Sequence, residues 1–127
     1  MASILVIDDE EDVRCLLVAF LTRLGHVVRQ ADDGAVGLKL NKAQPADLII
    51  TDLVMPTQEG LGTIRELRRI NPTARIVAMS GGFASDPRLY LDMAKKLGAD
   101  RVLRKPFQLP ELQAAVEETL AGPAPAK

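Results

Sequence analysis

Short apolar runs alternate with segments of helical periodicity along the whole of this 127-residue chain. The runs are rich in Val, Ile and Leu, which is typical of strands that are buried on both faces. Strands that alternate with helices pair in parallel, because each crossover returns the chain to the same edge of the sheet. The five predicted strands are Ile4–Ile7, Val27–Val28, Leu48–Ile50, Arg75–Met79 and Arg101–Arg104.

Five other segments have apolar residues at spacings of three and four, the spacing of a helix with one buried face. Gly25 and Gly98 end two of them, as glycine commonly does. In the short second segment, Val36 and Leu40 are predicted to face the core. The predicted helices run from Val13 to Leu24, from Ala35 to Leu40, from Leu61 to Ile70, from Pro87 to Leu97 and from Pro110 to Leu120. The predicted fold class is α/β, a doubly wound five-stranded parallel sheet with five helices on both faces.

The composition limits the partners that such a domain can have. A net charge of −1 provides no general basic surface, so direct binding to nucleic acid or to a membrane is not expected. No apolar run at the start of the chain is long enough for a secretory signal or a membrane span. The single cysteine, Cys15, excludes an internal disulfide and is interpreted as structural; its isolation fits a reducing cytoplasm.

One folded domain is expected over residues 1–121, as a monomer or a weak dimer. Residues 122–127 are biased toward Pro and Ala. This segment is interpreted as a frayed tail or as the start of a truncated linker.

Polar side chains follow four of the predicted strands. Asp8 and Asp9 follow the first, Asp52 the third, Ser80 the fourth and Lys105 the fifth. The carboxyl ends of parallel strands meet at one edge of the sheet, where open α/β proteins bind ligands. Three carboxylates placed together repel one another, so a cation is expected among them, and hard oxygen ligands favour Mg²⁺. The cation, the ammonium and the hydroxyl together suit an anion with several oxygens, such as a phosphoryl group on Asp52.

Other charged residues are interpreted as structural. Glu11 and Asp12 lie at the start of the first predicted helix, where acids favour the helix dipole. Arg65, Arg68 and Arg69 form a basic patch on the third predicted helix and are interpreted as a solvated face. The strand-end residues, taken one at a time, also have structural readings as helix caps, turn residues or solvated charges. Their joint placement at one edge is what argues for a site.

Four motifs carry a resemblance to a known family. They are Val6–Glu10, Thr51–Pro56, Met79–Gly81 and Leu103–Phe107, each at the end of a predicted strand. With these motifs in this order, the chain resembles the receiver domain of two-component response regulators, in its single-domain, chemotaxis-regulator-like form. The resemblance extends from Ile4 to about Leu120. It implies a flavodoxin-like sheet with strand order 2-1-3-4-5.

The resemblance also implies the chemistry of the site. Asp52 would accept a phosphoryl group from a phosphohistidine on a sensor histidine kinase or a histidine phosphotransfer protein. Asp9 and Asp52 would bind Mg²⁺ directly, with Asp8 acting largely through water. The carbonyl of Val54 would complete the protein ligands. The domain is not expected to be an enzyme beyond its own phosphorylation and its own dephosphorylation by water.

The remaining implications concern how the signal leaves the site. Ser80 and Lys105 would hold the phosphoryl oxygens, and the Lys105–Pro106 peptide bond would be cis. The face made by the fourth helix, the fifth strand and the fifth helix would then shift and bind a downstream protein. Many members of the family carry an aromatic switch residue three positions before the lysine, but here that position is Val102. Val102 has no ring to swing, and we expect it to face inward in both states.

Two other functions compete with phosphate acceptance as interpretations of these residues. A receiver-like interaction module that binds partners without taking phosphate is the alternative, but such a scaffold has no need of the complete strand-end set. A phosphatase with an aspartyl nucleophile would need a second acid two residues after Asp52, where the chain has Val54.

Overall fold

The computed structural model describes residues 2–53, 60–80, 92, 95–96 and 98–122. Its strands are β1 (Ser3–Ile7), β2 (Val27–Ala31), β3 (Leu48–Asp52), β4 (Arg75–Ser80) and β5 (Arg101–Arg104). Its helices within this part of the chain are α1 (Glu11–Arg23), α2 (Gly34–Ala43), α3 (Gly60–Ile70) and α5 (Leu109–Ala121). No helix among the described residues has the length and apolar character needed to cross a membrane.

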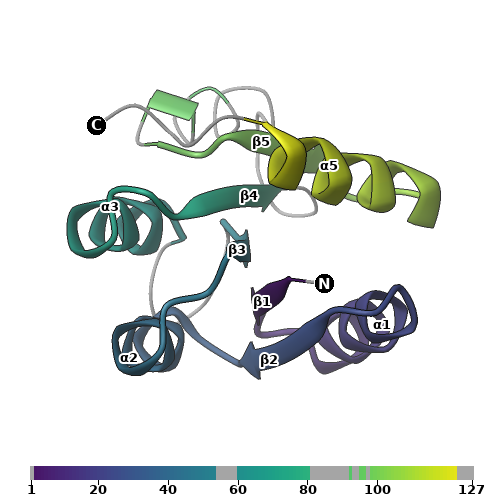
Figure 1. Cartoon of the computed structure of the whole chain (residues 1–127), viewed down its shortest axis with the longest axis horizontal. Coiled ribbons are helices and arrows are strands. Elements are labelled where there is room, and N and C mark those ends of the chain that lie inside the picture. Colours follow the sequence, from purple (N-terminus) through teal and green to yellow (C-terminus); the bar gives the residue numbers. More distant parts are fainter. Residues whose placement is uncertain (1, 54–59, 81–91, 93–94, 97, 123–127) are drawn as a thin grey trace.

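All five strands form one parallel sheet in the order β2-β1-β3-β4-β5, which confirms the predicted sheet and its strand order. Helices α1 and α5 cover one face of the sheet, and α2 and α3 cover the other (Figure 1). The chain winds outward from β1 to β2 on one side and from β3 to β5 on the other. The winding therefore reverses between β1 and β3, the kind of position at which open α/β sheets bind ligands.

Successive residues of the central strands pack into two separate cores. In β1, Leu5 and Ile7 belong to the core under α2 and α3, while Ile4 and Val6 belong to the core under α1 and α5. All four side chains are fully buried. Because both faces of the sheet are covered, the middle of each central strand is an unbroken apolar run, as the sequence indicated. These strands form a rigid support for the residues at their ends.

Helix α2 buries only part of the predicted face. Its buried residues are Gly34, Gly37 and Asn41, whereas Val36, predicted to face the core, is 39% exposed. The cause lies at Gly37, where any added Cβ would collide with the side chain of Ile7. The backbone of α2 packs directly on the sheet at this point, and Val36 is turned to the side of the contact.

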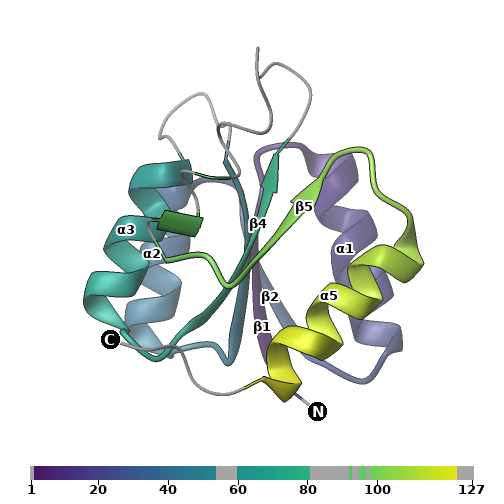
Figure 2. The ribbon, with the colours of Figure 1, turned by 90° about the horizontal axis from the view of Figure 1, so that it is seen from above.

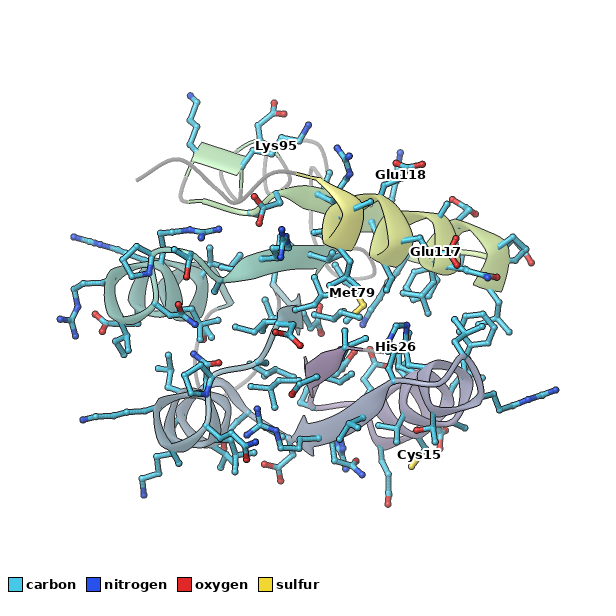
Figure 3. The ribbon with its side chains drawn as sticks, viewed as in Figure 1. Cys15, His26, Met79, Lys95, Glu117 and Glu118 are labelled. Atoms are coloured by element: carbon cyan, nitrogen blue, oxygen red, sulfur yellow. The ribbon has the colours of Figure 1, made fainter. Side chains whose placement is uncertain are left out.

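At other positions, the apolar spacing predicted burial correctly for some residues and incorrectly for others. Leu40 packs against the core as predicted. In α1, Leu17 and Leu21 are fully buried, but Leu16 is 52% exposed although it fits the same spacing. Cys15, interpreted as structural, is exposed on the outer side of α1 and has no part in the core (Figure 3).

The fourth predicted helix, from Pro87 to Leu97, lies almost wholly outside the described residues. The backbone of Asp92, Lys95 and Lys96 is helical, and the label α4 is reserved for this segment. The complete set of five helices therefore stays a prediction.

The interpretation of the basic patch on α3 as a solvated face is wrong for Arg68. Its side chain is only 17% exposed, and its guanidinium donates to the carbonyls of Pro72, Ala74 and Gly98. It also donates to the Asp100 carboxylate at 3.3 Å. These acceptors come from the segment before β4 and the segment before β5. Arg68 thus fastens the amino edge of the sheet, meaning the edge at which the strands begin.

Candidate functional site

The candidate residues gather at the carboxyl edge of the sheet, meaning the edge at which the strands end (top of Figure 2). Asp52 and Ser80 are the last residues of β3 and β4, and Asp8 directly follows β1. Lys105 directly follows β5, and its backbone N–H donates to the carbonyl of Ser80 at 2.7 Å. The ends of buried strands thus hold these side chains in place, as the sequence predicted.

Lys105 lies at the centre of the cluster. Its Nζ is 3.1 Å from Oδ2 of Asp8, 3.4 Å from Oδ2 of Asp52 and 3.4 Å from Oε1 of Glu10. The side chain is 16% exposed. Burial by itself would lower the pKa of Lys105, but the charges of Asp52 and Asp8 outweigh burial and raise that pKa. The lysine is therefore a permanent cation among three carboxylates.

Asp8 is the most deeply buried acid of the cluster, with no exposed surface. Its Oδ1 accepts a hydrogen bond from the backbone N–H of Glu10 at 2.9 Å, and its Oδ2 accepts from Lys105. Burial raises the pKa of the Asp8 carboxyl, and these two partners offset that rise only in part. A charged Asp8 would therefore be stabilised by further positive charge at this edge.

The acids of the cluster also fit a hard divalent cation. Asp8, Glu10 and Asp52 each contribute an oxygen to a group whose members lie within 4.8 Å of one another. Together with Lys105, the four groups have a formal net charge of −2. Carboxylate oxygens at this spacing are the ligands that Mg²⁺ and similar cations prefer.

The members of this group differ from the predicted ligand set. Asp9 is half-buried but does not belong to the group among the described residues, and Val54 lies outside them. Glu10 belongs to it, although the sequence placed Glu10 only in the motif that follows the first strand and predicted no ligand role for it. Its place in the acidic run after β1 was a signal, but the direction of its side chain was not readable from the sequence.

Ser80 supplies a hydroxyl at the same edge of the sheet. The residue is fully buried, and its Oγ has no hydrogen-bond partner among the described residues. An unpaired buried hydroxyl costs about 1–3 kcal/mol, so a hydrogen-bond acceptor arriving at this edge would be favoured. Strand β4, which carries Ser80, pairs directly with β3, which carries Asp52.

Two further features were implied by the family resemblance. The Lys105–Pro106 peptide bond is cis, as implied. Val102 is half-buried and packs against the core under α2 and α3, so it faces inward in this state. Its position in a second state stays a prediction.

Comparison with known proteins gives a consistent result. The sequence model of the response regulator receiver domain family matches residues 4–117 of the chain. The probable chemotaxis protein CheY of Rhizobium etli is 36% identical, over 91% of this chain and 89% of that protein. The DNA-binding transcriptional regulator NtrC of Azospirillum brasilense is 39% identical over 98% of this chain, which spans 25% of that relative.

Solved structures agree with the sequence comparisons. The receiver domain of NtrX from Brucella abortus has a TM-score of 0.88 and 28% identity, over 94% of this chain and 99% of that one. A response regulator receiver domain protein from Clostridium thermocellum has a TM-score of 0.86 and 30% identity, with 94% of both chains covered. The likeness therefore covers both the sheet and the edge at which the acids lie.

Proposed function

Since the chain belongs to the response regulator receiver domain family, we propose that Asp52 accepts a phosphoryl group from a phosphohistidine on a sensor histidine kinase or a histidine phosphotransfer protein. One observation carries this proposal above the others. The Asp52 carboxylate stands at the end of a buried strand, is 4% exposed, and lies 3.4 Å from the Lys105 ammonium. A fixed, shielded carboxylate beside a cation is suited to act as a nucleophile toward phosphorus.

In the proposed reaction, an oxygen of the Asp52 carboxylate bonds to phosphorus as the bond from phosphorus to the histidine nitrogen breaks. The histidine nitrogen leaves with the electron pair. In the later reset, water attacks the same phosphorus and inorganic phosphate leaves, which restores the carboxylate. Both reactions act on the domain itself, so we do not assign the protein a separate substrate.

Mg²⁺ is the proposed cofactor. The ligands would be Asp9 and Asp52, with Asp8 acting through water and the Val54 carbonyl completing the set, as in the family. The oxygen chemistry of Asp8, Glu10 and Asp52 supports a divalent cation at this edge. When bound, the ion supplies positive charge that offsets repulsion among the carboxylates and the phosphoryl oxygens.

Ser80 and Lys105 are proposed to hold the phosphoryl oxygens. The Lys105 ammonium already lies within 3.4 Å of Asp52, and the Ser80 hydroxyl is buried on the neighbouring strand with no partner among the described residues. Neither side chain donates a hydrogen bond to a main-chain carbonyl among the described residues. Each can therefore donate to an anion without breaking such a bond. Charge-assisted donation of this kind stabilises a phosphoryl group more than neutral donation would.

The output is proposed to leave through the face of α4, β5 and α5, toward a downstream protein. Val102 on β5 would transmit the change by packing, since it has no ring to rotate. We propose that the protein is cytoplasmic. The histidine kinases that phosphorylate receiver domains do so in the cytoplasm, and a single cysteine fits a reducing compartment.

The test is incubation with acetyl phosphate and Mg²⁺, followed by intact-mass measurement. The wild-type chain is expected to gain one phosphoryl group, and the Asp52→Ala variant none. Asp12→Ala is the matched control, because Asp12 is an exposed acid in the first turn of α1 and lies outside the acidic group found among the described residues. Its phosphorylation should equal that of the wild type.

Two outcomes would contradict the proposal. One is no added mass in the wild-type chain, which would favour a module that binds partners without phosphate. The other is equal added mass in the wild type and in Asp52→Ala, which would place the phosphoryl group on a different residue.

A further inference from the structure

Glu10 stands apart from the other acids of the site. Its side chain is 60% exposed, whereas Asp8 and Asp52 are almost completely buried. Even so, its carboxylate lies 3.4 Å from Nζ of Lys105 and within 4.8 Å of the other two acids. The residue therefore forms the solvent-exposed side of the cluster.

The local backbone explains why the Glu10 side chain turns toward the cluster. Glu10 is the N-cap residue of α1, and its carbonyl accepts the first helical bond, from Arg14. Its own N–H is held by the Asp8 carboxylate. An N-cap side chain usually accepts from the N–H groups of the first turn, but Glu10 makes no such bond. With its backbone fixed at both ends and its capping role unused, the side chain reaches Lys105 instead.

We infer that Glu10 is a positioning residue that holds the Lys105 ammonium toward the solvent side of the cluster and competes for it with the phosphoryl group on Asp52. The inference rests on the proposed function and adds to it a residue outside the expected ligand set. Lys105 contacts three carboxylates, and its three N–H donors are shared among them. A phosphoryl group on Asp52 can accept hydrogen bonds from all the donors of the Lys105 ammonium only when the contact between Lys105 and Glu10 breaks.

The geometry gives Glu10 two opposing effects. Its negative charge adds to the field of Asp8 and Asp52, which strengthens binding of a divalent cation. The same charge restrains Lys105 and repels an incoming phosphate donor, which slows phosphorylation once the cation is bound. A partly exposed ion pair is worth about two- to fivefold in an equilibrium, so each effect should be of that size.

The test compares Glu10→Gln with Glu11→Gln. Glu11 is the next residue, an exposed acid in the first turn of α1, and its replacement makes the same change in net charge beside the same helix. Mg²⁺ affinity is measured by calorimetry. The rate of phosphorylation by acetyl phosphate is measured by intact mass at saturating Mg²⁺. Circular dichroism checks the fold of each variant.

The expected result is a pair of changes with opposite consequences. Glu10→Gln should bind Mg²⁺ about two- to fivefold more weakly, yet phosphorylate about two- to fivefold faster at saturating Mg²⁺. Glu11→Gln should match the wild type in both. A residue that merely supported the start of α1 would change thermal stability and neither of these quantities.

Each other outcome overturns the inference in its own way. Equal Mg²⁺ affinity and equal rates in Glu10→Gln, Glu11→Gln and the wild type would remove Glu10 from the site while leaving the proposed function standing. Loss of folding in Glu10→Gln alone would assign Glu10 a structural role. A wild-type chain that takes no phosphoryl group would remove the proposed function, and the inference with it.

Discussion

The two edges of the sheet surround a partly buried cation in opposite ways. At the amino edge, the Arg68 guanidinium donates to three main-chain carbonyls and to one carboxylate, Asp100. At the carboxyl edge, the Lys105 ammonium faces three carboxylates and leaves an excess of negative charge. In the first arrangement, the charge of Arg68 is matched by the one carboxylate of Asp100. In the second, the four charged groups have a formal net charge of −2, which favours the binding of a cation.

The choice of cation at each edge fits this difference. The guanidinium of Arg68 is a rigid fork whose donors match several fixed carbonyls at once. The ammonium of Lys105 is a compact charge on a flexible side chain, so it can move from one carboxylate to another anion at the same edge of the sheet. The comparison indicates that the contacts at the amino edge stabilise the fold. The carboxyl edge retains electrostatic repulsion, which lowers stability but favours the binding of a cation.

The largest effect that this comparison predicts is at the amino edge. Arg68→Ala should lower the free energy of unfolding by about 3 kcal/mol, because three carbonyls and a partly buried carboxylate lose their donor. Urea unfolding measures this loss. Phosphorylation of the folded protein by acetyl phosphate should be unchanged, since Arg68 lies at the opposite edge from Asp52.

The neighbouring Arg69 provides the control. Its side chain is 70% exposed and pairs with Glu66 on the same helix, so Arg69→Ala should change stability by less than about 0.5 kcal/mol. Equal losses in the two variants would show that charge on α3, and not the set of acceptors at the amino edge, determines the effect.

A smaller effect of opposite sign is predicted at the carboxyl edge. Asp8→Asn should raise the free energy of unfolding by about 1 kcal/mol in the absence of Mg²⁺, because it removes a fully buried charge from a cluster with excess negative charge. Lys105 keeps Asp52 and Glu10 as partners in this variant.

Adding Mg²⁺ sharpens this second prediction. Ligand binding to the folded state stabilises it, so the wild type should gain stability from Mg²⁺ and the gain should disappear with a chelator. Asp8→Asn should gain less, because its site has lost a carboxylate. If Asp8→Asn were instead destabilised in the absence of Mg²⁺, the claim that this edge retains repulsion would be wrong.

The sequence predicted the carboxyl edge better than the amino edge, and the reason is physical. Asp8, Asp52, Ser80 and Lys105 each directly follow an apolar strand or end it, so topology alone brings them together. The acceptors of Arg68 are mostly carbonyls, which every residue carries, and no side-chain pattern marks them. Arg68 therefore looked like part of a solvated face, as Arg69 is.

Side-chain direction was a second limit of sequence reasoning. Val36 fits an apolar spacing, yet it is exposed because the backbone of Gly37 packs on the sheet. Glu10 fits a capping position, yet its carboxylate joins Lys105. In both cases the deciding fact is a contact between segments, and periodicity along one segment does not contain it.

The last prediction compares one buried polar side chain from each edge, and its smaller effect is at Ser80. Asn41, near the start of β3, is 2% exposed, and its Oδ1 accepts from the Ala46 N–H at 2.9 Å. Asn41→Ala leaves that N–H buried without its acceptor and should cost about 1–2 kcal/mol. Ser80 is equally buried, but its hydroxyl has no partner among the described residues. Ser80→Ala should therefore be neutral or stabilise by up to about 1 kcal/mol.

Phosphorylation separates the same two variants in the reverse order. Ser80→Ala removes a proposed donor to the phosphoryl oxygens, so the fraction phosphorylated by acetyl phosphate should fall, while Asn41→Ala should leave that fraction unchanged. Urea unfolding and intact mass on the same samples give both quantities. A Ser80→Ala variant that lost as much stability as Asn41→Ala would mean that the serine hydroxyl already supports the fold. The polar groups of the two edges would then serve the same purpose, because a hydroxyl that supports the resting fold is not held in reserve for a ligand.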